Sequence, residues 1–134
     1  MYRILVAIDD TVDHARVQAE TVRAMPGAKG ETEAVLLHVF TDNPAGASIG
    51  QIEAARTANE ILTEAGVDVV MDETSGDPAE MILRYADEHD VDLVCLGGRK
   101  RSPAGKALFG SVTQDVILGT EKPVVVCGEK RVEG

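Results

Sequence analysis

Residues 93–113 read LVCLGGRKRSPAGKALFGSVT and place a buried strand, a glycine-rich loop and a helix start in direct succession. The loop runs from Gly97 to Gly110, and Ser111 follows it at the point where a helix can begin. The unpaired N–H groups of such a loop and the positive end of the helix dipole converge on one place, which suits an anion. The stretch therefore predicts a phosphate cradle at the end of a strand.

Strands and helices alternate on both sides of this stretch. Apolar runs rich in branched residues predict strands at residues 2–8, 33–40, 67–71, 92–96 and 124–127. Apolar stripes at helical spacing predict helices from about residue 11, at residues 48–65, from residue 77 and at residues 111–118. This order predicts a single Rossmann-like α/β domain, in which helices cover both faces of a five-stranded parallel sheet.

Cap residues locate the helix starts. Asp10 or Thr11 can cap the first helix, and Ser48 with Gln51 forms the pattern of a capping box before the second. Asp77 precedes a proline and stands three residues before Glu80, which predicts a second box. These residues predict helix starts at about residues 11, 48 and 77.

Composition limits the classes of partner. The chain has 134 residues, is 44% apolar and carries a net charge of -10, so we expect one acidic globular domain with the surface of a salt-adapted protein. Nucleic acid would be repelled, and no apolar run approaches the length of a membrane span. The N-terminus resembles no secretory leader, which favours a cytoplasmic location. Cys95 and Cys127 lie in apolar strands and are expected to be reduced core thiols.

Two familiar phosphate motifs are absent by residue count. The Walker pattern fails because Lys100 stands where its first glycine belongs and Ala107 where its hydroxyl belongs. The dinucleotide fingerprint fails because the first strand is followed by Asp9 and Asp10, with no glycine before Gly27.

A third pattern does match. In it a glycine is followed by two residues, a second glycine position, nine residues and then Gly-Ser/Thr. It spans Gly97 to Ser111 and resembles the nucleotide loop of the universal stress protein family, as do the opening ILVAID at residues 4–9 and the PVVV at residues 123–126. Lys100 occupies the second glycine position. Its Cβ can block the close approach that glycine permits, or its ammonium group can neutralise a phosphate, and both readings stay open.

The resemblance implies a fold and a ligand. The expected fold is that of adenine nucleotide alpha hydrolases with strand order 3-2-1-4-5, formed by residues 1–128 and followed by a charged tail at residues 129–134. The expected function is an adenine-nucleotide sensor or signalling module that binds ATP or AMP, with or without Mg²⁺. Its implied ligand contacts are Asp9, Val39, Leu96, Gly97, Gly98, Lys100, Gly110, Ser111, Val112 and Thr113.

Alternatives from other classes remain. The resemblance also implies a homodimer formed through the last strand, residues 124–127, and a dimeric scaffold that binds no nucleotide is the second hypothesis. A phosphorelay receiver domain would use Asp72 as its phosphate acceptor and a lysine after its fifth strand, whereas Lys122 precedes that strand here. No nucleophile and base pair is evident, so at most slow ATP hydrolysis is expected.

The remaining single residues are expected to be structural. His14, His38 and His89 share no spacing, so neither a metal site nor a catalytic site is predicted. Three large apolar or aromatic residues are assigned to the core, namely Met81, Tyr85 and Phe109. The loop cations Arg99, Lys100 and Arg101 can form a solvated face or contact an anion.

Overall fold

The computed structural model describes residues 1–43 and 45–128, except for the side chain of Arg101, so the expected tail at residues 129–134 lies outside the described residues. The sheet of the described residues has six strands, of which five are parallel in the order β3, β2, β1, β4, β6, while the short β5 (Ala107–Leu108) pairs antiparallel with β4. Their bounds are β1 Tyr2–Ile8, β2 Thr32–Phe40, β3 Asp68–Ser75, β4 Leu93–Arg101 and β6 Val124–Gly128. This confirms the expected order 3-2-1-4-5, with β6 as the fifth parallel strand.

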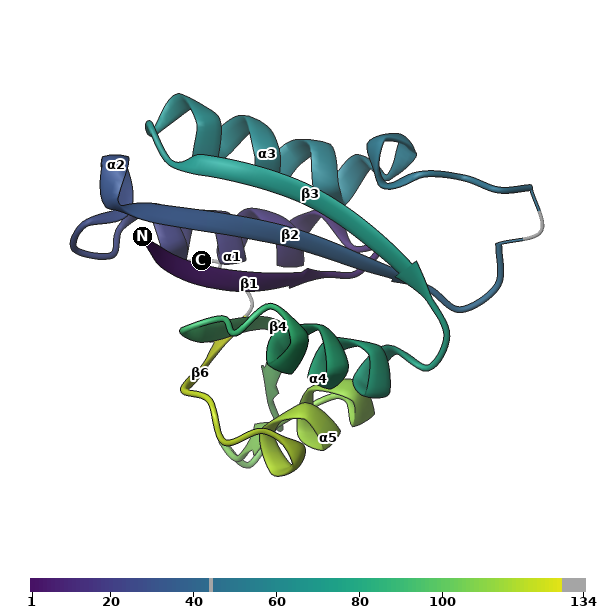
Figure 1. Cartoon of the computed structure of the whole chain (residues 1–134). Coiled ribbons are helices and arrows are strands. Elements are labelled where there is room, and N and C mark those ends of the chain that lie inside the picture. Colours follow the sequence, from purple (N-terminus) through teal and green to yellow (C-terminus); the bar gives the residue numbers. More distant parts are fainter. Residues whose placement is uncertain (44, 129–134) are drawn as a thin grey trace.

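Helices cover both faces of the sheet, with α1 and α3 on one side and α4 and α5 on the other (Figure 1). Their bounds are α1 Val12–Arg23, α3 Glu53–Glu64, α4 Pro78–Glu88 and α5 Ser111–Gly119, and a short α2 spans Ala28–Glu31. Alternate residues of the central strands face opposite layers: Leu5 packs with α4 and α5, and Val6 packs with α1 and α3. Two apolar cores therefore hold the sheet rigidly between them.

The glycine-rich stretch is not the plain loop that the sequence predicts. Strand β4 continues to Arg101 and turns back into a two-residue antiparallel strand, β5 (Ala107–Leu108). Gly105 has φ +82°, and its N–H donates to the Ser102 carbonyl oxygen at 2.8 Å, which closes the turn. A serine-proline-alanine-glycine turn inside the loop thus converts it into a hairpin.

The helix expected at residues 48–65 is divided in two. Ser48 and Gln51 do form the predicted capping box, but they close only a 3-10 turn, η1 (Ile49–Gln51). Ile52 is extended, at φ -89° and ψ 113°, and α3 begins after it. The apolar spacing alone could not reveal this break, because Ile49 and Ile52 still face the core.

Two other local expectations need correction. Strand β3 runs to Ser75, four residues beyond the expected end at Met71, because its polar residues alternate on a half-exposed edge strand. Thr11 occupies the N-cap position of α1 without a side-chain cap bond. Asp77 does cap α4 by accepting from the Glu80 N–H at 3.0 Å, and the Glu80 carboxylate pairs with Arg84.

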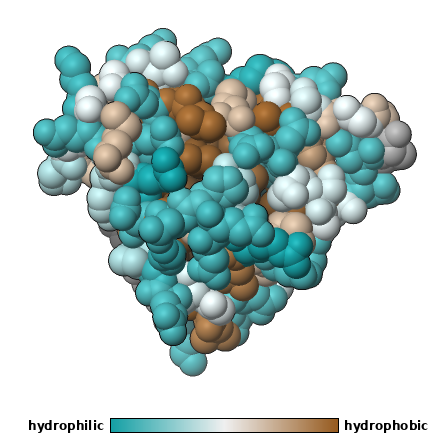
Figure 2. Space-filling view, in the orientation of Figure 1, coloured by the Kyte–Doolittle hydropathy of each residue, from teal (hydrophilic) through white to brown (hydrophobic). Residues whose placement is uncertain are grey.

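The surface seen in Figure 2 is mainly hydrophilic, with apolar areas over β3 and α5. Val70 on β3 and Leu118 on α5 are among the exposed apolar side chains. Among the described residues, no helix is both long enough and apolar enough to span a membrane.

Candidate functional site

A pocket of about 600 Å³ lies beyond the carboxyl ends of β1, β2 and β4. In the sheet, β1 has β2 on one side and β4 on the other. The chain fills the sheet outward from β1 first through β2 and β3 and then on the other side through β4, so the pocket lies where the strand order reverses. Such a switch point is the usual ligand site of an open parallel sheet. All ten residues expected to contact a ligand line this pocket: Asp9, Val39, Leu96, Gly97, Gly98, Lys100, Gly110, Ser111, Val112 and Thr113.

The buried amide of Gln18 occupies the point where β1 and β4 separate. The last paired residues of these strands are Val6 and Cys95, and beyond them Gln18 Nε2 donates to the Ala7 oxygen at 2.8 Å and to the Cys95 oxygen at 3.2 Å. These bonds satisfy carbonyl groups that the diverging strands would otherwise leave unpaired. Gln18 therefore supports the floor of the pocket.

Glycine suits position 97 because a side chain there would be crowded by this amide and by His14. A Cβ at Gly97 would lie 3.0 Å from Gln18 Oε1 and 3.3 Å from His14 Cβ. Gln18 Oε1 itself is buried and accepts no hydrogen bond from the described residues. The first glycine of the loop thus allows β4 to pass close over α1.

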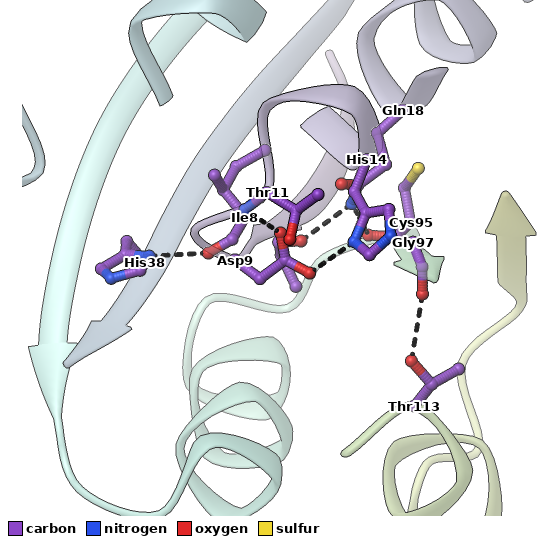
Figure 3. A network of polar contacts seen from close by, with 10 residues as sticks. Ile8, Asp9, Thr11, His14, Gln18, His38, Cys95, Gly97 and Thr113 are labelled. Atoms are coloured by element: carbon purple, nitrogen blue, oxygen red, sulfur yellow. Dashed lines mark hydrogen bonds and ion pairs between the residues drawn. The ribbon is translucent and has the colours of Figure 1, made fainter. Parts of the chain in front are cut away.

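Asp9 is held in place at the tip of β1 by two contacts (Figure 3). Its Oδ1 accepts from the Thr11 N–H at 2.8 Å, and its Oδ2 lies 2.8 Å from His14 Nδ1. Because a carboxylate accepts, this contact assigns the proton of the His14 ring to Nδ1. The first turn of α1 is therefore organised by Asp9 rather than by a side-chain cap from Asp10 or Thr11.

His38 lies on the opposite wall of the same pocket and is buried. Its Nδ1–H donates to the Ile8 oxygen at 2.7 Å, and its ring meets Phe40 edge to face at a centroid distance of 4.6 Å. Two of the three histidines thus share the pocket, which their sequence spacing does not indicate. No group of three or more potential metal ligands occurs among the described residues.

The glycine hairpin supplies one wall. Lys100 pairs with Leu108 in the β4–β5 ladder, so its backbone is extended and the position does not need glycine. Leu108 and Phe109 are exposed and line the pocket, which corrects the assignment of Phe109 to the core. Tyr85 is half-buried and packs against the core beneath α4, as expected, and Met81 is half-buried.

The charged loop residues have different surroundings. The Arg99 guanidinium lies against Gly128 of β6, where a Cβ would be 2.8 Å from it, and Arg99 does not line the pocket. Lys100 does line it. Of the described cations of this loop, Lys100 is therefore the one placed to meet an anion.

Helix α5 begins at the end of the hairpin. Gly110 precedes it with φ -64° and ψ 160°, and no atom of the described residues lies within 4 Å of a Cβ built there. Ser111 is exposed at the first turn, and Thr113 Oγ1 donates to the Gly97 carbonyl oxygen at 3.2 Å. The open N–H groups of this turn face the pocket with the positive end of the helix dipole.

Cys95 lies in β4, two residues before Gly97, and Cys127 lies in the neighbouring strand β6, with their Sγ atoms 3.7 Å apart. Both are buried and free, as expected from the sequence. The hydrogen bond from Cys95 lowers the pKa of Cys127, while that same bond and burial raise the pKa of Cys95. The contact between them was not predictable from their separation of 32 residues.

The residues that a receiver domain would need have other roles. Asp72 lies inside β3 rather than at its end and accepts a hydrogen bond from the Tyr85 hydroxyl at 2.8 Å. Burial and this carboxylate raise the pKa of Tyr85. Lys122 forms an ion pair with Asp90 at 2.8 Å, before the last strand. The geometry therefore does not support a phosphorelay site.

Comparison with known proteins gives consistent matches. The family model described as universal stress protein family matches residues 1–128. The stress response protein NhaX of Bacillus subtilis is 26% identical over 115 residues, which are 86% of this chain and 69% of NhaX.

Solved structures match over nearly the whole chain. A universal stress protein from Archaeoglobus fulgidus is 31% identical with a TM-score of 0.72, and the match covers 95% of this chain and 98% of that one. A universal stress protein from the same organism in complex with dAMP is 26% identical with a TM-score of 0.67, again over 95% and 98% of the two chains.

Proposed function

Because this chain belongs to the universal stress protein family, we propose that it binds an adenine nucleotide, AMP or ATP, and acts as a sensor or signalling module. The observation that carries the proposal is the convergence of all ten expected contact residues on one pocket at the switch point of the sheet. The dAMP complex of the Archaeoglobus fulgidus relative supports the choice of adenine.

The pocket offers different chemistry at its two sides, and we propose that the nucleotide lies across it. Asp9 and the carboxyl end of β2 at Val39 would receive the base and ribose, since a carboxylate and backbone groups can pair with their donors and acceptors. The hairpin and the first turn of α5 would receive phosphate through N–H groups and the Ser111 hydroxyl.

Lys100 favours a ligand with phosphates, because it places a cation on the wall of the pocket in a protein of net charge -10. Since no group of three or more metal-ligating side chains occurs in the described part of the chain, we propose that any Mg²⁺ enters as a complex with ATP. At most slow hydrolysis of ATP is proposed for this site.

The scaffold hypothesis is supported by a separate observation. In the described residues β6 pairs with β4 alone, and Val124, Val125 and Val126 are half-exposed on this edge strand. We propose that a second copy pairs along β6, which would cover an edge that otherwise invites aggregation. Light scattering of the purified chain should give the mass of a dimer, whereas a monomer at all concentrations would contradict pairing along β6.

A cytoplasmic location remains a prediction.

Nucleotide retained through purification provides the test. The purified protein is denatured, and the supernatant is separated by ion-pair chromatography and identified by mass spectrometry. We expect AMP or ATP in proportion to protein, or its recovery after incubation with either compound and rapid desalting. Absence of nucleotide in both experiments would favour the scaffold.

A further inference from the structure

His14 is a pocket residue that the nucleotide-loop pattern does not include. It lies on the first turn of α1, lines the pocket, and keeps 17% of its side chain exposed. One ring nitrogen, Nδ1, is held by Asp9 Oδ2 at 2.8 Å. The ring is therefore held in one orientation on the pocket wall. A carboxylate commonly orients a histidine in this way and leaves its other ring nitrogen available to bind a ligand.

The other ring nitrogen, Nε2, is available. It forms no hydrogen bond with a described residue, and it is not among the buried polar atoms that lack a partner, so solvent reaches it. The ring also lies beside the glycine loop, since a Cβ at Gly98 would be 3.6 Å from His14 Cε1. A ligand held by Gly97 and Gly98 would thus lie next to the imidazole (Figure 3).

We propose that His14 is a further ligand-contact residue, whose Nε2 meets the ribose and phosphate portion of the bound nucleotide. The inference rests on the proposed function, because it assigns a second contact within the same pocket. With Nδ1–H donated to Asp9, neutral Nε2 accepts from a ribose hydroxyl, and protonated Nε2 donates to a phosphate oxygen.

Other charged groups share this pocket and must be separated from His14. Asp9 and Asp10 face it from the β1–α1 connection, His38 from β2 and Lys100 from β4. His38 Nε2 lies 3.6 Å from Asp10 Oδ1, and its Nδ1 is bonded to the backbone. On α1 itself, Asp13 pairs with Arg16 at 3.1 Å. The ligand phosphate also gains a proton near pH 6, so comparisons are made between variants at one pH.

Two substitutions separate the role of Nδ1, which holds Asp9, from the proposed role of Nε2, which contacts the ligand. His14→Asn places an amide N–H near the position of Nδ1 and preserves the bond to Asp9, but it removes Nε2. His14→Gln reaches toward the position of Nε2 with a group that cannot be protonated. If His14 serves only to hold Asp9, His14→Asn should bind nucleotides as the natural protein does.

The experiment is calorimetric titration of AMP and adenosine into the three proteins at one pH. We expect His14→Asn to weaken AMP binding roughly tenfold. Adenosine should be affected less than AMP. His14→Gln should keep part of the adenosine affinity and lose part of the preference for AMP.

A second measurement does not depend on the variants folding. In ¹⁵N-histidine-labelled natural protein, AMP should shift the Nε2 resonance of His14 more than adenosine does. Equal AMP affinity for His14→Asn and the natural protein, or an Nε2 resonance that AMP leaves unchanged, would overturn the inference. If neither compound binds any of the proteins, the proposed function fails instead.

Discussion

Thr113 and Gly97 are joined by a hydrogen bond of 3.2 Å, in which the Thr113 hydroxyl donates to the Gly97 carbonyl oxygen. The two residues lie on either side of the glycine hairpin, so this bond joins the first turn of α5 to the middle of β4. Thr113 is buried and is among the four buried polar residues of the described chain. The family pattern assigns Thr113 to ligand binding, and the geometry gives it a bracing role as well.

Thr113→Val should therefore weaken nucleotide binding through the shape of the hairpin. The substitution keeps the side-chain volume but leaves the Gly97 oxygen unpaired, which costs about 1 kcal/mol of stability. Urea denaturation and AMP titration measure the two effects. Thr113→Ser keeps the hydroxyl and is the control. Unchanged binding and stability in Thr113→Val would show that the bond contributes nothing to the site.

Gln18→Met should destabilise the domain by about 2–3 kcal/mol, because the Ala7 and Cys95 carbonyl groups lose their donor at a buried position. The measurement is the free energy of unfolding in urea. Gln114→Met on the exposed surface of α5 is the matched control and should change stability by less than about 0.5 kcal/mol. Equal effects of the two substitutions would contradict the role assigned to the buried amide.

Lys100→Ala should weaken ATP binding roughly fivefold while adenosine binding stays nearly constant, because the lysine lines the pocket and only the phosphates carry charge. The difference should shrink in high salt as the charges are screened. Lys100→Arg retains the cation and serves as the control. A loss of adenosine binding in Lys100→Ala would indicate that the hairpin had changed shape.

The thiol pair predicts a pH dependence of stability. The Cys127 pKa falls from 9.0 to about 6 on folding, so the folded protein releases this proton more readily than the unfolded chain does. Its contribution to stability should rise between about pH 6 and pH 9 and be lost as pH falls through the folded pKa. The raised pKa of Cys95 works against this rise in stability. It does so only at pH values where the thiol of the unfolded chain would ionise, near the top of that window.

Cys127→Ser tests that assignment, since it removes the ionising group while keeping a small side chain beside Thr21. Stability measured in urea across this pH range should be flatter for Cys127→Ser than for the natural protein. Ultraviolet absorbance of the thiolate should likewise disappear from the lower part of the range. Identical pH profiles for the two proteins would show that the pair does not ionise at reduced pH.

Much of the fold could be predicted because its signals are local. The apolar strands and the spacing from Gly97 to Gly110 lie within short stretches, and the ten expected residues do converge on one pocket. What the sequence did not reveal depends on contacts between distant segments. Gln18 lies on the buried stripe of α1, but its partners at Ala7 and Cys95 become apparent only when β1 and β4 diverge.

Contacts between distant segments also explain why the sequence did not place two histidines in the pocket or reveal the hairpin. His14 lies on a helix and His38 on a strand, and only the packing of α1 and β2 against β1 brings both side chains to one pocket. Phe109 has the character of a core residue, yet it follows the short strand β5 of the hairpin and is 40% exposed. A prior search for buried polar residues on apolar stripes would have selected Gln18.

The most direct test of nucleotide binding is calorimetric titration of AMP into the natural protein and into Gly110→Val. No described atom lies within 4 Å of a Cβ at Gly110, so the variant should fold, with thermal unfolding as the check. The valine adds bulk to a residue that lines the pocket at the N-terminus of α5, and this bulk should block the ligand. We expect saturable binding of one AMP per natural chain and no measurable heat from the folded variant. No binding by the natural protein, or equal affinity for both, would contradict the account.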